Sequence, residues 1–347
     1  MARVDREKLR EVIAKIPLLT VERSHGERGT QSFRDLATVI MTVFDYVEPE
    51  QFPGVIIIFK CLDDSHRPIA EDNAVVIHNP AVLGQETQGD VVLQALSDGR
   101  LLLWKNMQVD IASVAAGAVV YRYQGRREFF FAGTSETEVE KVGQYASLYA
   151  IPAFSDVRQA LEHYRTDMAK ESSCKILEGV WADPKRLFLV NGPEDTMRDS
   201  LIQFLKITVR DAETRPEQNM NARRPVDIKV TFNFSPRIAV IEIKWIGVSI
   251  HNDGRIAVRY TDARARVGAN QLVRYLNWNK QETPNHITRG YLVVFDARRR
   301  GLKKNAVAVS RPKGAYYRNR EVKFNPRFDK TRSDFERPIR MFMEPVY

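Results

Sequence analysis

Two neighbouring runs of alternating apolar and polar residues, VDIKVTF and RIAVIEIKWI, constrain the fold of this chain more than any other feature. They occupy residues 226–232 and 237–246. Because successive side chains of a β-strand point to opposite faces, a period of two indicates strands with one apolar face. Ser235-Pro236, between the runs, is typical of a turn. The sequence therefore predicts an antiparallel hairpin.

Four charged residues of this hairpin are predicted to share one face. A turn centred between Ser235 and Pro236 sets Asp227 opposite Lys244. The same register sets Lys229 opposite Glu242. The other face is apolar and carries Ile228, Val230, Phe232, Ile241, Ile243 and Trp245. One side of the hairpin is thus apolar, and the other is charged at a single end.

The charged end favours a cation site. Two carboxylates brought together there, Asp227 and Glu242, repel each other unless a cation lies between them, and hard oxygen ligands suit Mg²⁺ or Mn²⁺. Lys244 points the same way and would orient a water molecule or offset charge that develops on a phosphate. This combination suits phosphodiester hydrolysis. The alternative is an exposed cross-strand cluster of salt bridges that contributes little energy.

Length and charge indicate two dissimilar halves. A chain of 347 residues is long for one domain. Residues 1–150 contain 16 Lys+Arg and 21 Asp+Glu, a net charge of −5, and residues 151–347 contain 37 and 23, a net charge of +14. The basic half is expected to bind phosphates. With two cysteines and no run of apolar residues long enough for a bilayer, we expect a cytoplasmic protein without a disulfide framework, zinc site or membrane span.

The N-terminal half, 1–150, is predicted to be a separate α+β domain that serves recognition, dimerisation or regulation. Its expected helices span 3–16 and 31–46, and its expected strands span 55–59, 74–77, 101–104, 118–123 and 128–131. Asp63-Asp64 with His66 and the segment GERGT at 26–30 do not by themselves indicate a second metal site or a phosphate loop.

The C-terminal half, 151–347, shows a more regular order. A connecting helix is expected over 155–169. After it we expect a helix at 194–207, strands at 226–233, 238–246 and 255–260, a helix at 267–279 and a strand at 291–295. The expected fold is therefore mixed α/β, with an α-β-β-β-α-β core in this half.

These features resemble the PD-(D/E)XK nuclease superfamily, which has the restriction-endonuclease-like fold. Its signature is an Asp, a variable gap, Glu or Asp, any residue and Lys; here it is Asp227, a gap of 14 residues and Glu242-Ile243-Lys244. The resemblance covers Glu194 to Phe295 and implies the αβββαβ core. It also implies that Asp227, Glu242 and the main-chain carbonyl of Ile243 bind Mg²⁺ or Mn²⁺, with Lys244 at the attacking water.

Two flanking helices carry further residues of the resemblance. Glu194 shares a stripe with apolar residues, and the family often places a glutamate on its first core helix near the metal. The alternative for Glu194 is a charge that interacts with the helix dipole. Gln271 and Tyr275 resemble a Gln-x-x-x-Tyr motif of related nucleases, with Gln271 facing the scissile phosphate and Tyr275 on the same side. The alternative for this pair is an ordinary amphipathic helix.

The C-terminal tract, 298–347, is basic and rich in aromatics, with 15 Lys+Arg against 5 Asp+Glu. Basic residues neutralise phosphates and aromatic rings stack on unpaired bases, so the tract is a candidate to hold nucleic acid. The alternative is a basic segment wrapped on the domain with its aromatics in the core. The predicted nucleic-acid contacts are Lys229, Tyr275, Arg298, Arg299, Arg300, Lys303 and Lys304.

The resemblance implies a Mg²⁺-dependent nuclease that hydrolyses phosphodiester bonds in DNA, as an endonuclease of a prokaryotic restriction or anti-phage system. Asp227, Glu242, Lys244, Glu194 and Gln271 are its predicted catalytic residues. Two alternatives stay open, a ribonuclease of the same fold and a nucleic-acid-binding protein without activity. Because one site per chain cuts one strand, we expect a homodimer or a higher homo-oligomer.

Overall fold

The chain forms two compact units, each with helices and a mixed β-sheet. The computed structural model describes residues 6–49, 52–83, 89–139, 147–150, 153–216, 226–233, 235–283 and 285–347. Unit 1 is Met1–Pro152 and unit 2 is Ala153–Tyr347, a division close to the boundary expected at residue 150. Within the described ranges, no helix is long and apolar enough to cross a bilayer.

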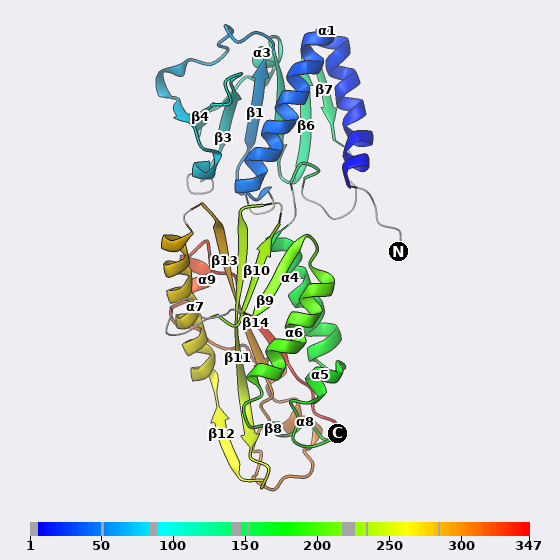
Figure 1. Ribbon diagram of the computed structural model, residues 1–347, viewed down its shortest axis with the longest axis vertical. Coiled ribbons are helices and arrows are strands. Elements are labelled where there is room, and N and C mark those ends of the chain that lie inside the picture. Colours follow the sequence, from blue (N-terminus) through cyan, green and yellow to red (C-terminus); the bar gives the residue numbers. More distant parts are fainter. Residues whose placement is uncertain are drawn as a thin grey trace. The chain divides into compact units, whose positions relative to one another are not determined.

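Unit 1 is a seven-stranded sheet with the order β2-β4-β3-β1-β5-β6-β7. Its strands are β1 (Ile56–Cys61), β2 (Val75–Ile77), β3 (Val91–Ala95), β4 (Leu101–Lys105), β5 (Ala118–Gln124), β6 (Arg127–Ala132) and β7 (Ser135–Glu138). Only the β1–β3 pair is parallel among the pairs described. Helix α1 (Arg6–Tyr46) packs its apolar residues on one face of this sheet (Figure 1).

The remaining elements of unit 1 are short. The sheet face away from α1 carries a second apolar cluster that includes Phe59, Trp104 and Val120. Residues of helix α3 (Ile111–Ala115) belong to that cluster. Two 3-10 turns, η2 (Glu71–Asn73) and η3 (Pro80–Val82), lie along the chain on either side of β2. Both faces of the sheet are therefore covered by apolar contacts.

Helix α1 differs from the two separate helices predicted at 3–16 and 31–46. The helical conformation runs through the segment between them and is interrupted at Gly26, with φ 62° and ψ −149°. Glycine adopts this positive φ without the steric cost that a Cβ brings, so the break falls there. Figure 1 shows α1 as two arms joined by a sharp turn. The segment GERGT at 26–30 thus belongs to a helix.

Unit 2 is built on a sheet with the order β14-β13-β11-β10-β9. Its strands are β9 (Ala212–Pro216), β10 (Ile228–Phe232), β11 (Arg237–Ile250), β13 (Ile287–Asp296) and β14 (Ile339–Phe342). Neighbours from β9 to β11 are antiparallel, and β11, β13 and β14 are parallel. The C-terminal part of β11 pairs with β12 (Ile256–Tyr260) and β8 (Leu189–Val190).

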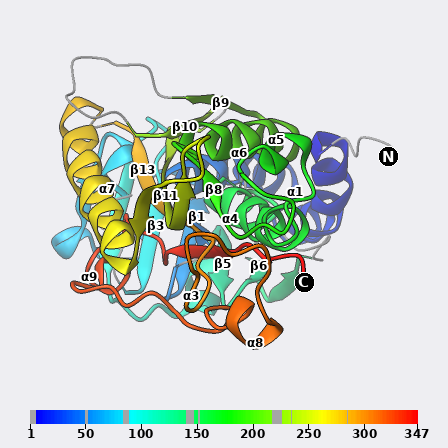
Figure 2. The same cartoon turned by 90° about the horizontal axis from the view of Figure 1, so that it is seen from below.

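Helices cover both faces of the unit 2 sheet. Helix α4 (Phe154–His163), continued by the π-helix η4 (Tyr164–Ala169), and helix α6 (Glu194–Thr208) share one core with it, and α7 (Asp262–Glu282) shares another (Figure 2). The short helices are α5 (Lys175–Glu178), α8 (Arg311–Gly314) and α9 (Phe328–Thr331). Strand β11 is consequently buried along nearly its whole length.

The predicted hairpin forms between β10 and β11, but its register is shifted by two residues. Ile228 pairs with Ile241, and Lys229 pairs with Val240, not with Glu242. Continued by one residue, this register sets Asp227 opposite Glu242, not opposite Lys244. The ladder ends with Thr231 opposite Ile238, so the turn is centred earlier than predicted. An even shift preserves which face each side chain occupies, and the acidic pair and Lys244 stay together.

Helix α7 packs closely on the charged face of β11 because Gly268 has no side chain. A Cβ at Gly268 would lie 2.5 Å from Cγ of Lys244 and 3.1 Å from Cδ1 of Leu292. The first atom belongs to the stem of a buried side chain, which has little room to move. The absence of a Cβ at this position therefore allows the lysine to lie beneath the helix.

We expect Gly268→Ala to lower the free energy of unfolding by about 1 to 3 kcal/mol, because the added methyl overfills a packed interface. Helix propensity alone would favour alanine by about 1 kcal/mol, so the sign of the change is informative. Denaturant unfolding measures it. The control is Asn277→Ala on the exposed face of the same helix. Equal stability of the Gly268→Ala protein and the parent would contradict this packing.

Candidate active site

Four residues singled out from the sequence meet where β10, β11 and α6 come together. Glu242 and Lys244 lie on β11, Asp227 immediately precedes β10, and Glu194 is the first residue of α6. The Lys244 ammonium lies 2.7 Å from Oε1 of Glu242 and 3.0 Å from Oε1 of Glu194. Its distance to Oδ2 of Asp227 is 4.0 Å. Three carboxylates from three elements therefore surround one ammonium group.

The main chain of Ile243 completes this cluster. Its N–H donates to Oδ2 of Asp227 at 2.7 Å, and its carbonyl accepts from Nζ of Lys244 at 2.7 Å. The Ile243 side chain belongs to the apolar core on the opposite face, as the period of two requires. The cluster thus contains the oxygens that the sequence predicted as metal ligands, from Asp227, Glu242, Glu194 and the Ile243 carbonyl.

Burial sets the protonation of the cluster. Glu242 is 4% exposed and Lys244 is 3% exposed. Loss of solvent raises the pKa of Glu242 to about 7, although the nearby ammonium opposes this, and loss of solvent also raises the pKa of Asp227. Burial disfavours the charge on Lys244, but the surrounding carboxylates outweigh it and raise the pKa of the lysine. Lys244 is therefore cationic, and Glu242 titrates near neutrality.

Among the described residues, Arg264 makes a further ion pair with the cluster, and the positive charge of Arg198 acts on Asp227 from nearby. An NH2 of Arg264, in the first turn of α7, lies 3.3 Å from Oε2 of Glu194. With all three carboxylates ionised, their charge of −3 exceeds the +2 of Lys244 and Arg264. Uncompensated buried charge is costly, so the cluster favours an additional proton or an additional cation.

The donor atoms fit a hard divalent cation, but their present arrangement holds an ammonium. Carboxylate and carbonyl oxygens are the ligands that Mg²⁺ and Mn²⁺ prefer, and Mg²⁺ requires distances of about 2.1 Å. Within the described part of the chain, no group of three or more His, Cys, Asp or Glu is spaced to hold a metal ion. The carboxylate oxygens lie 2.7, 3.0 and 4.0 Å from Nζ of Lys244. An ion on the same oxygens would require the ammonium to move aside.

The two predicted residues of α7 differ in their surroundings. Gln271 is half-buried, and its Oε1 is buried without a hydrogen-bond partner. Among the residues that the structure describes, no hydrogen bond joins Gln271 to the carboxylates. Tyr275 is 7% exposed and belongs to the core between α7 and the sheet, with its ring 5.6 Å from that of Trp278. The ring of Tyr275 is thus packed in the core, and its contact with nucleic acid stays a prediction.

Two of the predicted basic contacts are used inside the protein. Arg299 is 4% exposed, and its guanidinium donates to main-chain carbonyls of Arg186 and Met343 at 3.0 and 2.7 Å. Burial lowers the pKa of Arg299 to about 10. Arg298 pairs with Asp296 at 2.7 Å and also with Asp262. Both guanidinium groups are thus engaged inside the protein, and their contact with nucleic acid stays a prediction.

The other basic candidates have accessible charges. Arg300, Lys303 and Lys304 are exposed, and Lys229 on β10 is half-buried. Arg300 lies with its guanidinium carbon 4.4 Å from the ring centroid of Tyr316. The alternative for the C-terminal tract was a segment wrapped on the domain with its aromatic side chains in the core. Three of these side chains, Phe324, Phe328 and Phe335, pack against the core beneath α7.

Arg264 was missed by the sequence prediction. The predicted helix began at residue 267, whereas α7 begins at Asp262, so Arg264 lay outside it. Its spacing of four residues from Gly268 sets both on one face of the helix. An earlier helix start at Thr261, a favourable N-cap residue type, was the signal that could have identified it.

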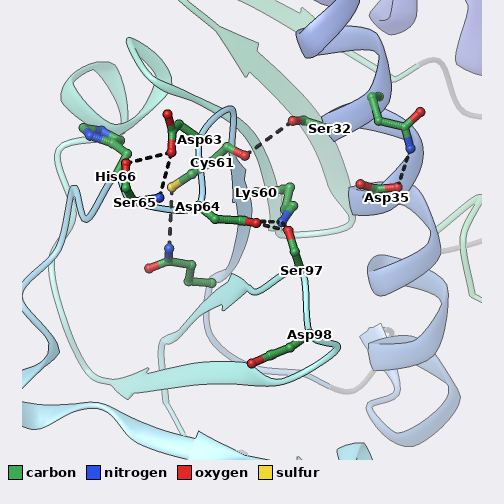
Figure 3. A network of polar contacts seen from close by, with 12 residues as sticks. Ser32, Asp35, Lys60, Cys61, Asp63, Asp64, Ser65, His66, Ser97 and Asp98 are labelled. Carbon is green, nitrogen blue, oxygen red and sulfur yellow. Dashed lines mark hydrogen bonds and ion pairs between the residues drawn. The ribbon is translucent and has the colours of Figure 1, made fainter.

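Unit 1 contains a separate polar network around the residues Asp63, Asp64 and His66 (Figure 3). Asp64 accepts hydrogen bonds from Lys60 at 2.9 Å and Ser97 at 2.6 Å. Asp63 accepts from the main chain and hydroxyl of Ser65 at 2.8 and 2.7 Å. These contacts fix the loops that follow β1 and β3.

Comparisons of the chain with models of protein families, with curated proteins and with solved structures gave no match.

Replacement of Lys244 by methionine is expected to leave three carboxylates without their shared ammonium. In EDTA, the free energy of unfolding of Lys244→Met should fall by about 3 to 5 kcal/mol, the usual cost of removing one partner of a buried ion pair. Millimolar Mg²⁺ should recover part of this loss, because it replaces the missing charge. Lys206→Met, at an exposed position of α6, is the control. Equal losses in the two variants would show that the ammonium is not the centre of the cluster.

Stability should depend on pH through Glu242. Its pKa is raised from an ordinary value of 4.5 to about 7, so the folded state holds the proton more tightly than the unfolded state. The resulting stabilisation is complete below pH 4.5 and is lost as pH rises through 7; a shift of this size corresponds to about 3 kcal/mol. The test measures the free energy of unfolding of the parent and of Glu242→Gln in EDTA, between pH 4 and about 8. Parallel stability curves would contradict the assignment.

Proposed function

We propose that this protein is a Mg²⁺-dependent nuclease that hydrolyses phosphodiester bonds, with DNA as its substrate. The observation that carries the proposal is the convergence of Asp227, Glu242 and Glu194 with the Ile243 carbonyl around a single cation. Structural salt bridges usually pair one acid with one base, whereas this cluster carries an excess of acid. Such an excess suits a site that accepts a further cation.

The order of elements supports the resemblance to PD-(D/E)XK nucleases. Helix α6 is followed by β9, β10 and β11, then by α7 and β13, with β12 inserted before α7. The sequence predicted three strands here, which correspond to β10, β11 and β12, and did not predict β9. The α-β-β-β-α-β order of that superfamily is obtained when β9 or β12 is counted as an addition to the core. The acidic residues lie on the central hairpin and the lysine lies on β11, which are the positions expected from the motif.

The chain offers distinct groups for each requirement of hydrolysis. Asp227, Glu242 and the Ile243 carbonyl would hold the ion, with Glu194 as a further ligand. When bound, the ion would polarise the phosphate and lower the pKa of a water molecule. Displaced from the oxygens, the Lys244 ammonium stays within reach because its stem is held beneath Gly268. It would donate a hydrogen bond to the attacking water or to a phosphate oxygen.

Two alternatives to a DNA nuclease can be distinguished from it by experiment. A ribonuclease would use the same phosphate-directed groups and would cleave RNA in place of DNA. A nucleic-acid-binding protein without activity would retain the cluster as a buried charge network and bind without cleaving. The excess of carboxylates favours the enzyme over this last alternative.

Cleavage assays test the proposal directly. The purified protein is incubated with supercoiled plasmid, linear duplex, single-stranded DNA and RNA, each with Mg²⁺, Mn²⁺ or EDTA. We expect metal-dependent cleavage of DNA, and a loss on the order of 100-fold or more in Glu242→Ala and Lys244→Ala. Arg274→Gln, on the exposed face of α7, should cleave like the parent. Undiminished cleavage by both cluster variants would place the activity elsewhere.

A further inference from the structure

Arg264 lies beside the carboxylate cluster with most of its hydrogen-bonding capacity unused. A guanidinium has five N–H donors. Within the described residues, the guanidinium of Arg264 makes one hydrogen bond, to Glu194 at 3.3 Å, and this distance is long for an ion pair. Its Nε is buried without an acceptor. The guanidinium therefore keeps N–H donors that a further acceptor can use.

The surroundings of Arg264 keep the guanidinium beside the cluster. Its central carbon lies 4.8 Å from the ring centroid of Tyr260, the last residue of β12. Its position in the first turn of α7 adds the positive end of a helix of 21 residues. The side chain is 29% exposed, so part of it is open to solvent. These features suit a donor that binds an anion arriving from outside.

The charge of the site determines when an anion can bind. With all three carboxylates ionised, their charge and that of Lys244 and Arg264 sum to −1, which repels a phosphodiester. A divalent cation changes the total to +1, which matches the single negative charge of a phosphodiester. The ion would then neutralise the charge of Glu194. Arg264 could exchange its long hydrogen bond to Glu194 for one to a phosphate with little loss of free energy.

We propose that Arg264 is a phosphate-binding residue of this site, held by Glu194 in the metal-free protein and turned to the phosphate oxygens once a divalent ion is bound. This inference rests on the proposed function. Its planar donors allow two parallel hydrogen bonds to a phosphate, which a lysine ammonium does not reproduce. The same residue thus balances charge before the ion binds and holds the substrate afterwards.

The test compares Arg264→Gln and Arg264→Lys with the parent and with Arg274→Gln, a matched arginine on the exposed face of the same helix. Fluorescence anisotropy measures binding of a fluorescein-labelled DNA duplex, once in Ca²⁺, with gels to verify that the duplex stays intact, and once in EDTA. Calorimetry measures Mn²⁺ binding without DNA. Melting temperatures establish that each variant is folded.

In Ca²⁺, we expect Arg264→Gln to bind the duplex at least tenfold more weakly than the parent, since a hydrogen bond to a charged group contributes about 1.5 to 3 kcal/mol. Arg264→Lys should lie between them, and Arg274→Gln should match the parent. In EDTA, the differences should vanish. Mn²⁺ affinity of Arg264→Gln should be unchanged or higher, because a nearby positive charge has been removed.

Each contrary outcome has a distinct meaning. If the parent binds Mn²⁺ and cleaves DNA while Arg264→Gln binds the duplex equally well, the role of Arg264 is wrong and the nuclease proposal stands. If Arg264→Gln loses Mn²⁺ binding together with DNA binding, Arg264 only positions Glu194, and the phosphate contact is overturned. If the parent binds neither Mn²⁺ nor nucleic acid, both proposals fail.

Discussion

A buried lysine ammonium shared by three carboxylates is the interaction on which unit 2 depends. An isolated charge of this kind would be costly in the interior, so Lys244 requires acidic partners within contact distance. That need accounts for Asp227 ahead of β10, for Glu194 turned inward at the start of α6, and for Gly268 where α7 crosses the lysine stem. The same arrangement keeps the acidic groups together in readiness for another cation.

The sequence predicted which residues meet, but not all of their neighbours. The period of two placed Asp227, Glu242 and Lys244 on one face of the hairpin. Glu194 was identified because it lies on the apolar face of its helix. Neither pattern depends on the exact strand register or on where the helix ends. Pairing partners depend on the number of residues in the turn, which alternation does not encode, so the register was shifted. Arg264 was missed because polar residues in a first helical turn carry no apolar period. Strands β7 and β9, SETE and AETRP, lack that period too.

Net charge overstated the basic surface of unit 2. Arg298 and Arg340 both pair with the fully buried Asp296, and Arg299 is enclosed by main-chain carbonyls. These arginines join the end of β13 to β14 and the C-terminal segment, which is a structural task. Burial decides whether a charge serves the fold or a partner, and a sequence of one chain does not reveal burial for long polar side chains.

Strand β11 links two sets of strands, because its first half pairs with β10 and β13 and its second half with β12 and β8. Its amides are therefore among those that open to solvent only when much of unit 2 unfolds, and hydrogen exchange there should report global opening. Glu242 and Lys244 lie on this strand. Local fluctuations that loosen loops would leave the spacing of these two groups unchanged.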